Sequence, residues 1–269
     1  MTDAVRKTRP ATSAPTLSRV NTERLISIVS PLMLLLIWEV LARLGWIDIR
    51  FFPAPSKISG TFFTMVENGS LWTNTWASLQ RLFWGFLLGG VPALVLGIAM
   101  GLNRTLRAIL DPIVAVTYPI PKSAILPLIL LIFGLGEASK IVMVATGVFY
   151  PIIINAMAGV LEIDQIHFDV SRNFGAGRLQ VFRTVALPGA LPLIMTGIKL
   201  GVGLGLVLIA IAEMVGAKSG LGYMIWNAWE ILSVETMYVG LITIAVLGLI
   251  FTLILNEIER LIVPWKAGR

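Results

Sequence analysis

Six apolar segments, each close to the length that crosses a lipid bilayer, constrain this chain more than any other feature. A membrane-crossing helix needs roughly 20 apolar residues, because about 1.5 Å of rise per residue must cover about 30 Å of hydrocarbon. Only 13% of the 269 residues are charged, whereas a soluble domain carries about 25%. We therefore predict an all-α integral membrane protein with about six transmembrane helices, over residues 26–44, 82–102, 112–133, 141–161, 191–212 and 238–258.

We expect one membrane domain over residues 26–264, flanked by two polar tails. Residues 1–25 are polar and basic, a composition typical of a flexible tail, and residues 265–269 form the second tail. If the N-terminus is inside, most of the 21 Lys and Arg residues fall in inside segments, among them Arg104, Arg172 and Arg178. The positive-inside rule then predicts that both termini and the loop at about 162–188 are cytoplasmic.

The segment Phe51–Arg81 mixes apolar and polar residues. Its Phe52–Ser56 stretch contains two prolines and reads as an extended turn, and Ser56 is a good cap for a helix that begins at Lys57. The residues that follow recur at helical spacing and include two tryptophans, Trp72 and Trp76. Two interpretations stay open: an amphipathic helix at the outer membrane interface, or a helix packed on the spans.

Some spans carry residues that lipid-facing helices avoid. Prolines interrupt the third span around Lys122, and freed backbone groups in a membrane are tolerated only against protein or a water-filled cavity. Lys122 either meets an anion there or extends its ammonium group to the membrane edge. Glu213 ends the fifth span and suits a gate or helix packing better than an anion ligand. The candidate pore and substrate path comprises Pro119, Pro121, Lys122, Gly201, Gly205 and Glu213.

The polar stretch between the fourth and fifth spans is the most informative. Asp169–Phe174 predicts a helix that Gly175 ends, because glycine adopts positive φ freely. Arg178–Val185 predicts a second short helix, and Leu187-Pro188 leads into the fifth span. A short helix–turn–helix of this kind is a rigid knob suited to docking in a groove of a soluble partner.

This stretch resembles the cytoplasmic loop of permease subunits of bacterial ABC importers. Their pattern is Glu-Ala-Ala, three residues, Gly, about nine residues, Ile, one residue and Leu-Pro. Here Asp169-Val170-Ser171 stands for Glu-Ala-Ala, Gly175 matches the glycine, Val185 stands for Ile, and Leu187-Pro188 matches the end. Further stretches look like the nitrate, sulfonate, taurine and bicarbonate branch: Phe52–Ser56, Ser78–Arg81, Pro127-Leu128, Phe133–Glu137, Lys140, Ala212–Met214 and Ser219–Tyr223.

The resemblance implies the type I ABC importer permease fold, with a cytoplasmic coupling helix, in the bacterial inner membrane. The implied partners are a second permease copy, two cytoplasmic ATPase subunits that bind ATP and Mg, an extracytoplasmic solute-binding protein and membrane lipid, with no nucleic acid. The solute would be a small anion such as nitrate, bicarbonate, taurine or an alkanesulfonate. The implied ATPase-coupling interface comprises Asp169, Val170, Ser171, Arg172, Gly175, Ala176, Leu187 and Pro188.

The sequence argues against catalytic activity in this chain. It has no Gly-x-x-x-x-Gly-Lys-Ser/Thr phosphate loop, no cysteine and a single histidine, His167, so we expect no catalytic residue, no metal site and no cofactor of its own. Arg172 and Arg178 either pair with acidic groups of the ATPase or simply follow the positive-inside rule. The alternative function is a self-contained secondary transporter, which would usually show internal repeats and ionisable residues at the membrane midplane.

Overall fold

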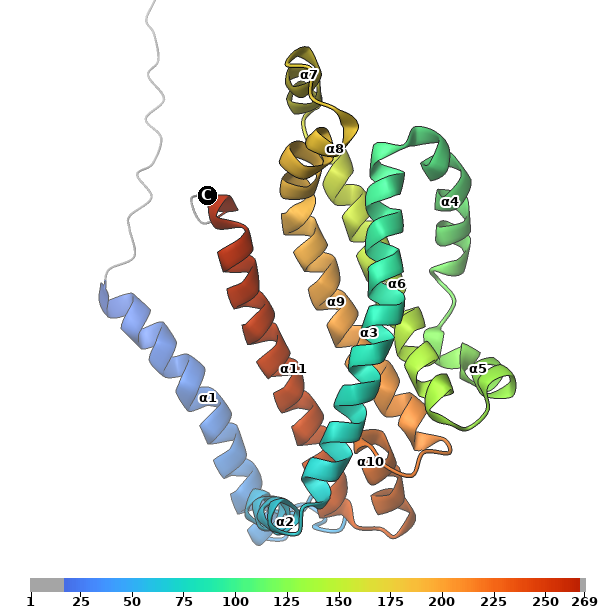
Figure 1. Cartoon of the computed structure of the whole chain (residues 1–269). Helices are drawn as coiled ribbons and strands as arrows, with labels where there is room; N and C mark the ends of the chain where they lie inside the picture. Colours follow the sequence, from blue (N-terminus) through green and yellow to red (C-terminus); the bar gives the residue numbers. More distant parts are fainter. Residues whose placement is uncertain (1–16, 267–269) are drawn as a thin grey trace, which may run out of the picture. The chain divides into compact units, whose positions relative to one another are not determined.

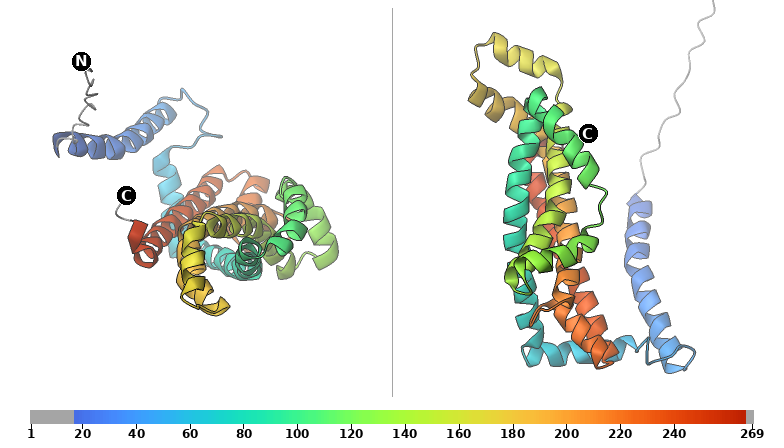
Figure 2. Two further views of the ribbon diagram at one scale, coloured as in Figure 1. Left: turned by 90° about the horizontal axis from the view of Figure 1, so that it is seen from above. Right: turned by 90° about the vertical axis from the view of Figure 1, so that its right-hand side faces the viewer.

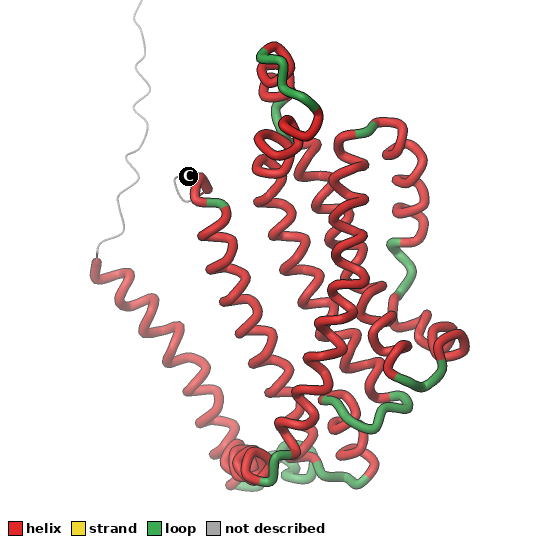
Figure 3. Tube along the Cα trace, in the orientation of Figure 1, coloured by secondary structure: helices red, strands yellow, loops and turns green. Residues whose placement is uncertain are grey.

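The computed structural model of the chain describes residues 17–266 and divides into two compact units, Met1–Lys57 and Ile58–Arg269. Every regular element in the described residues is helical, and no strand occurs among them (Figure 3). The all-α fold class predicted from hydropathy is therefore confirmed.

The first unit is built on α1 (Leu17–Arg43). This helix begins inside the segment predicted as a flexible tail, two residues after Pro15, which is the last proline before it. Residues 1–16 of that predicted tail lie outside the described residues. The first predicted span, residues 26–44, coincides with the second part of α1.

The turn that follows α1 differs in detail from the prediction. Helix α2 (Pro55–Glu67) begins one residue before Ser56, because proline has its φ preset for the first helical position. Ser56 is therefore the second residue of the helix and not its N-cap residue. Its backbone N–H and its hydroxyl instead donate to the two carboxylate oxygens of Glu39, at 2.9 and 2.7 Å.

Two helices divide the segment that was predicted as one amphipathic helix. α2 ends at Glu67 with only Ile58 and Met65 buried, and α3 (Ser70–Leu102) begins after a turn at Gly69. Trp72 and Trp76 thus lie in the first turns of a 33-residue span, and both are exposed. α3 starts about three turns earlier than the predicted span, because its polar residues find partners described below.

Helices α3, α6 (Glu137–Leu161) and α9 (Leu187–Met214) pack side by side and form the core of the second unit (Figure 1). α11 (Val234–Ile262) packs against α9 and against the short helix α10 (Leu221–Glu230). The core is aliphatic and includes Ala93, Val144, Val148, Ile152 and Ile209, each at most 2% exposed.

The third predicted span is broken, as its prolines indicated. It consists of α4 (Arg104–Thr117), a 3-10 turn η1 (Lys122–Ile125) and α5 (Leu126–Phe133). The two halves are bent by 86° at the break. They flank α6 on the side away from α11 (Figure 1).

Four helices in the described residues are long and apolar enough to cross a membrane, or five if the bent pair is one span. The four helices and the bent pair together coincide with the last five predicted spans. Short helices of the second unit lie at the two ends of its bundle. Helices α7 (Gln165–Asn173) and α8 (Arg178–Val181) lie at one end, and α10 lies at the other (Figures 1 and 2). A short π-helical turn, η2 (Phe182–Ala186), joins α8 to α9, and η3 (Pro264–Lys266) follows α11.

Candidate functional site

The loop between α6 and α9 projects beyond the spans as a compact hairpin (Figure 2). Asp164 caps α7 by accepting a hydrogen bond from the Ile166 N–H at 3.0 Å, so the helix begins four residues before the predicted start at Asp169. At its end Gly175 has φ of 74°. The Gly175 N–H donates to the Arg172 carbonyl, and the Ala176 N–H donates to that of Ser171. This pair of bonds is the Schellman motif, so the predicted glycine stop is confirmed.

The second predicted helix of the loop is not separate from the span. α8, η2 and α9 form one continuous helix, Arg178–Met214, of 37 residues. Pro188 has no N–H to donate in the α-helical pattern, and just before it the Leu187 N–H donates to the Phe182 carbonyl, which is a π-type bond. The loop is thus connected rigidly to the fifth span.

The residues predicted for the coupling interface sit on this hairpin with unequal exposure. Asp169, Val170, Arg172 and Gly175 are exposed, while Ser171, Ala176, Leu187 and Pro188 are half-buried. The Asp169 carboxylate lies 3.7 Å from the Arg172 guanidinium one turn along the same helix. That exposed pair leaves both groups accessible to another molecule.

Val170 was predicted as part of the coupling interface, but sequence reasoning missed the two apolar side chains beside it, Ile166 and Phe174. Ile166, Val170 and Phe174 follow one another at intervals of four residues, which places them on one face of a helix. They are 59%, 48% and 88% exposed, and we call them the apolar ridge. The signal was available, because a phenylalanine directly before a predicted helix-ending glycine in a polar loop has no core to enter.

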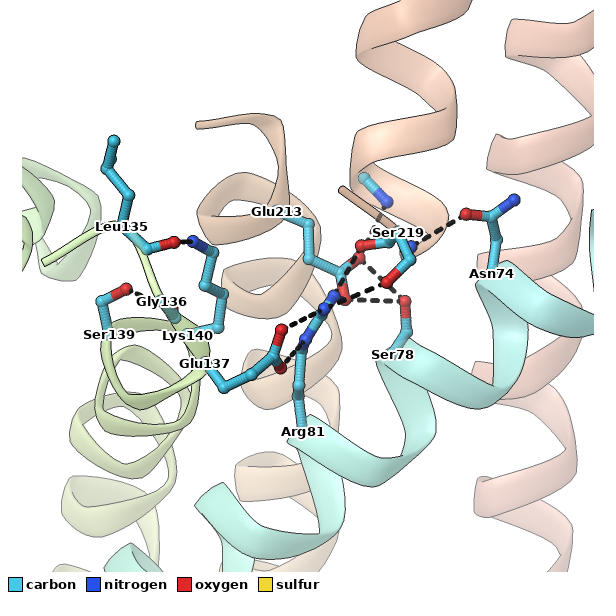
Figure 4. A network of polar contacts seen from close by, with 12 residues as sticks. Asn74, Ser78, Arg81, Leu135, Gly136, Glu137, Ser139, Lys140, Glu213 and Ser219 are labelled. Carbon is cyan, nitrogen blue, oxygen red and sulfur yellow. Dashed lines mark hydrogen bonds and ion pairs between the residues drawn. The ribbon is translucent and has the colours of Figure 1, made fainter. Parts of the chain in front are cut away.

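A buried network of charged and polar side chains lies at the opposite end of the bundle (Figure 4). Its centre is Arg81 of α3, which is 4% exposed. The Arg81 Nη1 donates to Glu213 of α9 at 2.8 Å, and Nε and Nη2 donate to the two oxygens of Glu137 at 2.6 and 2.7 Å. Nη1 and Nη2 also donate to the carbonyl and the hydroxyl of Ser219. Every nitrogen of the guanidinium group therefore has a partner within the chain.

Glu213 is completely buried, and its carboxylate accepts hydrogen bonds from three residues. Besides Arg81, it accepts from the Ser78 hydroxyl at 2.8 Å and from the Gly222 N–H at 2.9 Å. Isolated carboxylates are costly to bury, but paired and hydrogen-bonded ones are tolerated. Glu213 was predicted as part of the pore path, either as a gate or as a packing residue, and in the structure its carboxylate joins three helices.

The loop before α10 joins this network through hydrogen bonds from its backbone N–H groups. The Gly220 N–H donates to Asn74 of α3 at 2.9 Å, and the Leu221 N–H donates to the Ser78 hydroxyl at 2.8 Å. Gly220 has φ of 119°, and a Cβ there would lie 2.3 Å from the carboxylate carbon of Glu213. Only glycine fits this position, because a side chain would be both strained and in collision with the carboxylate.

The network is balanced in charge, and its central arginine is fully hydrogen-bonded. Two cations, Arg81 and Lys140, lie among two carboxylates, Glu137 and Glu213 (Figure 4). The Lys140 ammonium donates to the Leu135 carbonyl. With no free donor at its centre, the network is suited to tie together the ends of α3, α6, α9 and α10 and not to bind a solute.

A second polar feature lies at the break between α4 and α5. A cavity of ≈ 340 Å³ there is lined by residues that include Pro119, Pro121 and Lys122 of the predicted path. The Lys122 ammonium donates to the Thr117 and Tyr118 carbonyls at 2.9 and 3.2 Å. Its nitrogen also lies 3.8 Å from the centre of the Tyr150 ring.

The two glycines of the predicted path do not line this cavity. Gly201 and Gly205 are buried where α9 meets its neighbours. A Cβ at Gly205 would lie 2.9 Å from the Leu82 side chain of α3, and one at Gly201 would lie 3.4 Å from Ile152 of α6. They allow close helix packing in this chain, and their role in a pore stays a prediction.

The chain is similar to known proteins over most of its length. Residues 93–266 match the family described as binding-protein-dependent transport system inner membrane component. The chain is 36% identical over 245 residues to the taurine transport system permease protein of Escherichia coli, covering 89% of each chain. It is 34% identical over 236 residues to a putative aliphatic sulfonates transport permease protein of the same organism, covering 88% of this chain and 90% of the relative.

Among solved structures, an inward-facing form of the MetNI methionine ABC transporter contains a chain of the same fold. The TM-score is 0.61 at 23% sequence identity, covering 70% of this chain and 94% of that one. At this identity the likeness shows the fold, which is that of a type I ABC importer permease, as predicted. The chain belongs to the family of binding-protein-dependent transport inner membrane components.

Proposed function

We propose that this family member is the permease subunit of an ATP-driven importer for small organic sulfonates, and that its α7–α8 hairpin docks the ATPase. The substrate class comes from the relatives, which are named for taurine and aliphatic sulfonates. The family match favours this function over the self-contained secondary transporter, because a binding-protein-dependent system uses separate subunits.

The observation that carries the docking proposal is the apolar ridge. Ile166, Val170 and Phe174 are exposed side chains of α7 and of the residue that follows it, and this hairpin projects past the spans (Figures 1 and 2). Large apolar side chains fixed in such a position mark a protein contact, because ordering them in water brings no gain by itself. Asp169 and Arg172 flank the ridge and supply the polar rim that interfaces have.

The hairpin is also connected in a way that suits transmission of movement. Arg178–Met214 is one helix of 37 residues, about 55 Å long at 1.5 Å per residue. It runs from the hairpin to Glu213 in the buried network. A displacement of the hairpin by a closing ATPase pair would thus move the fifth span as a lever, in a rigid-body motion of the type that switches transporters.

The same proposal fixes the topology and the partners. The hairpin faces the cytoplasm, both termini are cytoplasmic, and the buried network lies towards the outer face of the bacterial inner membrane, in agreement with the distribution of basic residues. A second permease copy completes the pore, a binding protein delivers the sulfonate from outside, and the ATPase subunits hold ATP and Mg. None of the chemistry of ATP hydrolysis falls to this chain.

The experiment is co-purification and uptake with matched variants. The tagged chain is co-expressed with the ABC ATPase and the binding protein of the same transport operon, and taurine uptake is measured in proteoliposomes loaded with ATP. Phe174→Asp should leave the chain in the membrane but remove the ATPase and ATP-dependent uptake. Ile231→Asp, an equally disruptive change at an exposed site in the turn after α10, should retain both.

Two results would overturn the proposal. One is uptake by the wild-type chain that proceeds equally with ADP in place of ATP. The other is an unchanged ATPase complex in Phe174→Asp.

A further inference from the structure

We propose that the cavity at the α4–α5 break binds the sulfonate group transiently during transport, with Lys122 as the cation that recognises it. This inference rests on the proposed function and adds to it a place in the membrane domain where the substrate anion is recognised. It is drawn from the charge balance of the spans and from the way in which Lys122 is held.

Lys122 lies at the break between α4 and α5 and has no acidic partner in the described part of the chain. Arg81 is paired with Glu213 and Glu137, and the Lys199 ammonium of α9 is paired with Glu259 of α11. Lys140 makes no salt bridge within the described residues, but it lies in the network that contains Glu137 and the Arg81–Glu213 pair (Figure 4). Within residues 17–266, Lys122 forms no salt bridge, and no Asp or Glu lines its cavity. A cation without a counter-ion in a membrane segment marks a functional site.

The geometry of the break explains how this charge is kept in place. Thr117 is four residues before Pro121, which has no N–H, so the Thr117 carbonyl has no α-helical donor and accepts only a 3.3 Å bond from the Ile120 N–H along the backbone. The Lys122 ammonium adds a second donor, at 2.9 Å. The side chain is therefore fixed by neutral carbonyls, which orient the ammonium group without neutralising it.

The rest of the cavity suits a short organic sulfonate. Among its lining side chains, the hydroxyls of Tyr118 and Tyr150 are the only hydrogen-bond donors besides Lys122. The two rings lie 5.9 Å apart, one from the end of α4 and one from α6. Ile120, Pro151 and Leu204 complete the lining and offer an apolar surface to the carbon chain. A volume of ≈ 340 Å³ is at the lower end of the range for small-molecule sites.

The buried network at the other end of the bundle offers no such site. All of the Arg81 nitrogens already have partners within the chain, and the acids there match the cations. An incoming sulfonate would have to break two carboxylate contacts to reach Arg81. At Lys122 it meets a positive charge with nothing of opposite sign beside it.

The test separates a substrate contact from a purely structural role of the same lysine. The assembled transporter is placed in proteoliposomes, and taurine uptake is measured per assembled complex with binding protein at saturation. Lys122→Arg keeps the charge and the donors. Lys122→Gln keeps an N–H donor for the Thr117 carbonyl but removes the charge, and Tyr150→Phe keeps the ring but removes its hydroxyl.

We expect Lys122→Arg to retain at least half of the wild-type uptake, Lys122→Gln to lose tenfold or more, and Tyr150→Phe to lose severalfold. The yield of assembled complex should stay within twofold in all three. Unchanged uptake per complex in Lys122→Gln, or losses in Lys122→Gln that follow the yield of complex, would overturn the inference. Absence of ATP-driven uptake in the wild type would instead refute the proposed function, so the two failures are distinguishable.

Discussion

Replacement of Arg81 by methionine tests whether the buried network holds the ends of the helices together. The substitution keeps most of the side-chain volume but leaves Glu213 fully buried with only the Ser78 hydroxyl and the Gly222 N–H as donors. Glu137 stays well solvated, since its side chain is 66% exposed, so its loss of partner contributes little. The effect is therefore governed by the stranded charge of Glu213.

Removing one partner of a buried ion pair costs about 3–5 kcal/mol. For a domain of this size, each kcal/mol lowers Tm by about 2–4 °C, so Arg81→Met should lower the apparent Tm by roughly 6–20 °C. The assay is thermal unfolding of the purified chain in detergent. Arg260→Met provides the control, because Arg260 forms an exposed pair with Glu257 at 3.8 Å, and such pairs contribute about 0–1 kcal/mol.

A second substitution decides whether the stranded charge is the cause. Adding Glu213→Gln to Arg81→Met removes the charge but keeps a carbonyl oxygen for the Gly222 N–H. We therefore expect the double variant to be more stable than Arg81→Met alone, although each single change is destabilising. A Tm of the double variant below that of Arg81→Met, or a shift in Arg81→Met no larger than in the control, would refute the reasoning.

Two glycine predictions use matched pairs. Gly220→Ala, whose Cβ would lie 2.3 Å from Glu213, should lower the Tm clearly, whereas Gly203→Ala, in open space on α9, should leave it equal or raise it by the equivalent of about 0.5–1 kcal/mol; equal effects would contradict the packing argument. Gly175→Ala should cost about 1–2 kcal/mol at φ of 74° and weaken ATPase co-purification, whereas Gly177→Ala, at φ of −69°, should do neither. Loss of co-purification in both would contradict a role for the Gly175 turn.

The spans were predictable because hydropathy is a local property. α6, α9 and α11 each contain an uninterrupted apolar run, and the break between α4 and α5 was visible in Pro119 and Pro121. The start of α3 was not predictable in the same way. Its first turns carry Asn74, Ser78 and Arg81, which lower the local hydropathy. Their partners are distant in sequence: Glu137 lies 56 residues from Arg81, and the contacts with Glu213 and Gly220 span more than 130 residues.

The α7–α8 hairpin was predicted from its spacing, but its most exposed side chain was not. Gly175 could be assigned to a helix end because a positive φ is a local requirement. The signal for Phe174 was its place directly before Gly175 in a polar loop, where it has no core to enter. The π-turn that joins α8 to α9 was not predicted, although Pro188, which has no N–H, lies two residues after it.

Five of the seven stretches that resemble the sulfonate, taurine, nitrate and bicarbonate branch meet in space. Ser78–Arg81, Glu137, Lys140, Glu213 and Ser219–Tyr223 all contribute to the one buried network (Figure 4). A charge-balanced network whose central arginine has partners at every nitrogen offers no site to a solute, so these stretches identify an architecture and not a substrate. Under the proposed function, discrimination between solutes arises in the binding protein or at residues outside the network. Among the described residues of the membrane helices, Lys122 is the position that we propose for recognising the charge of the solute.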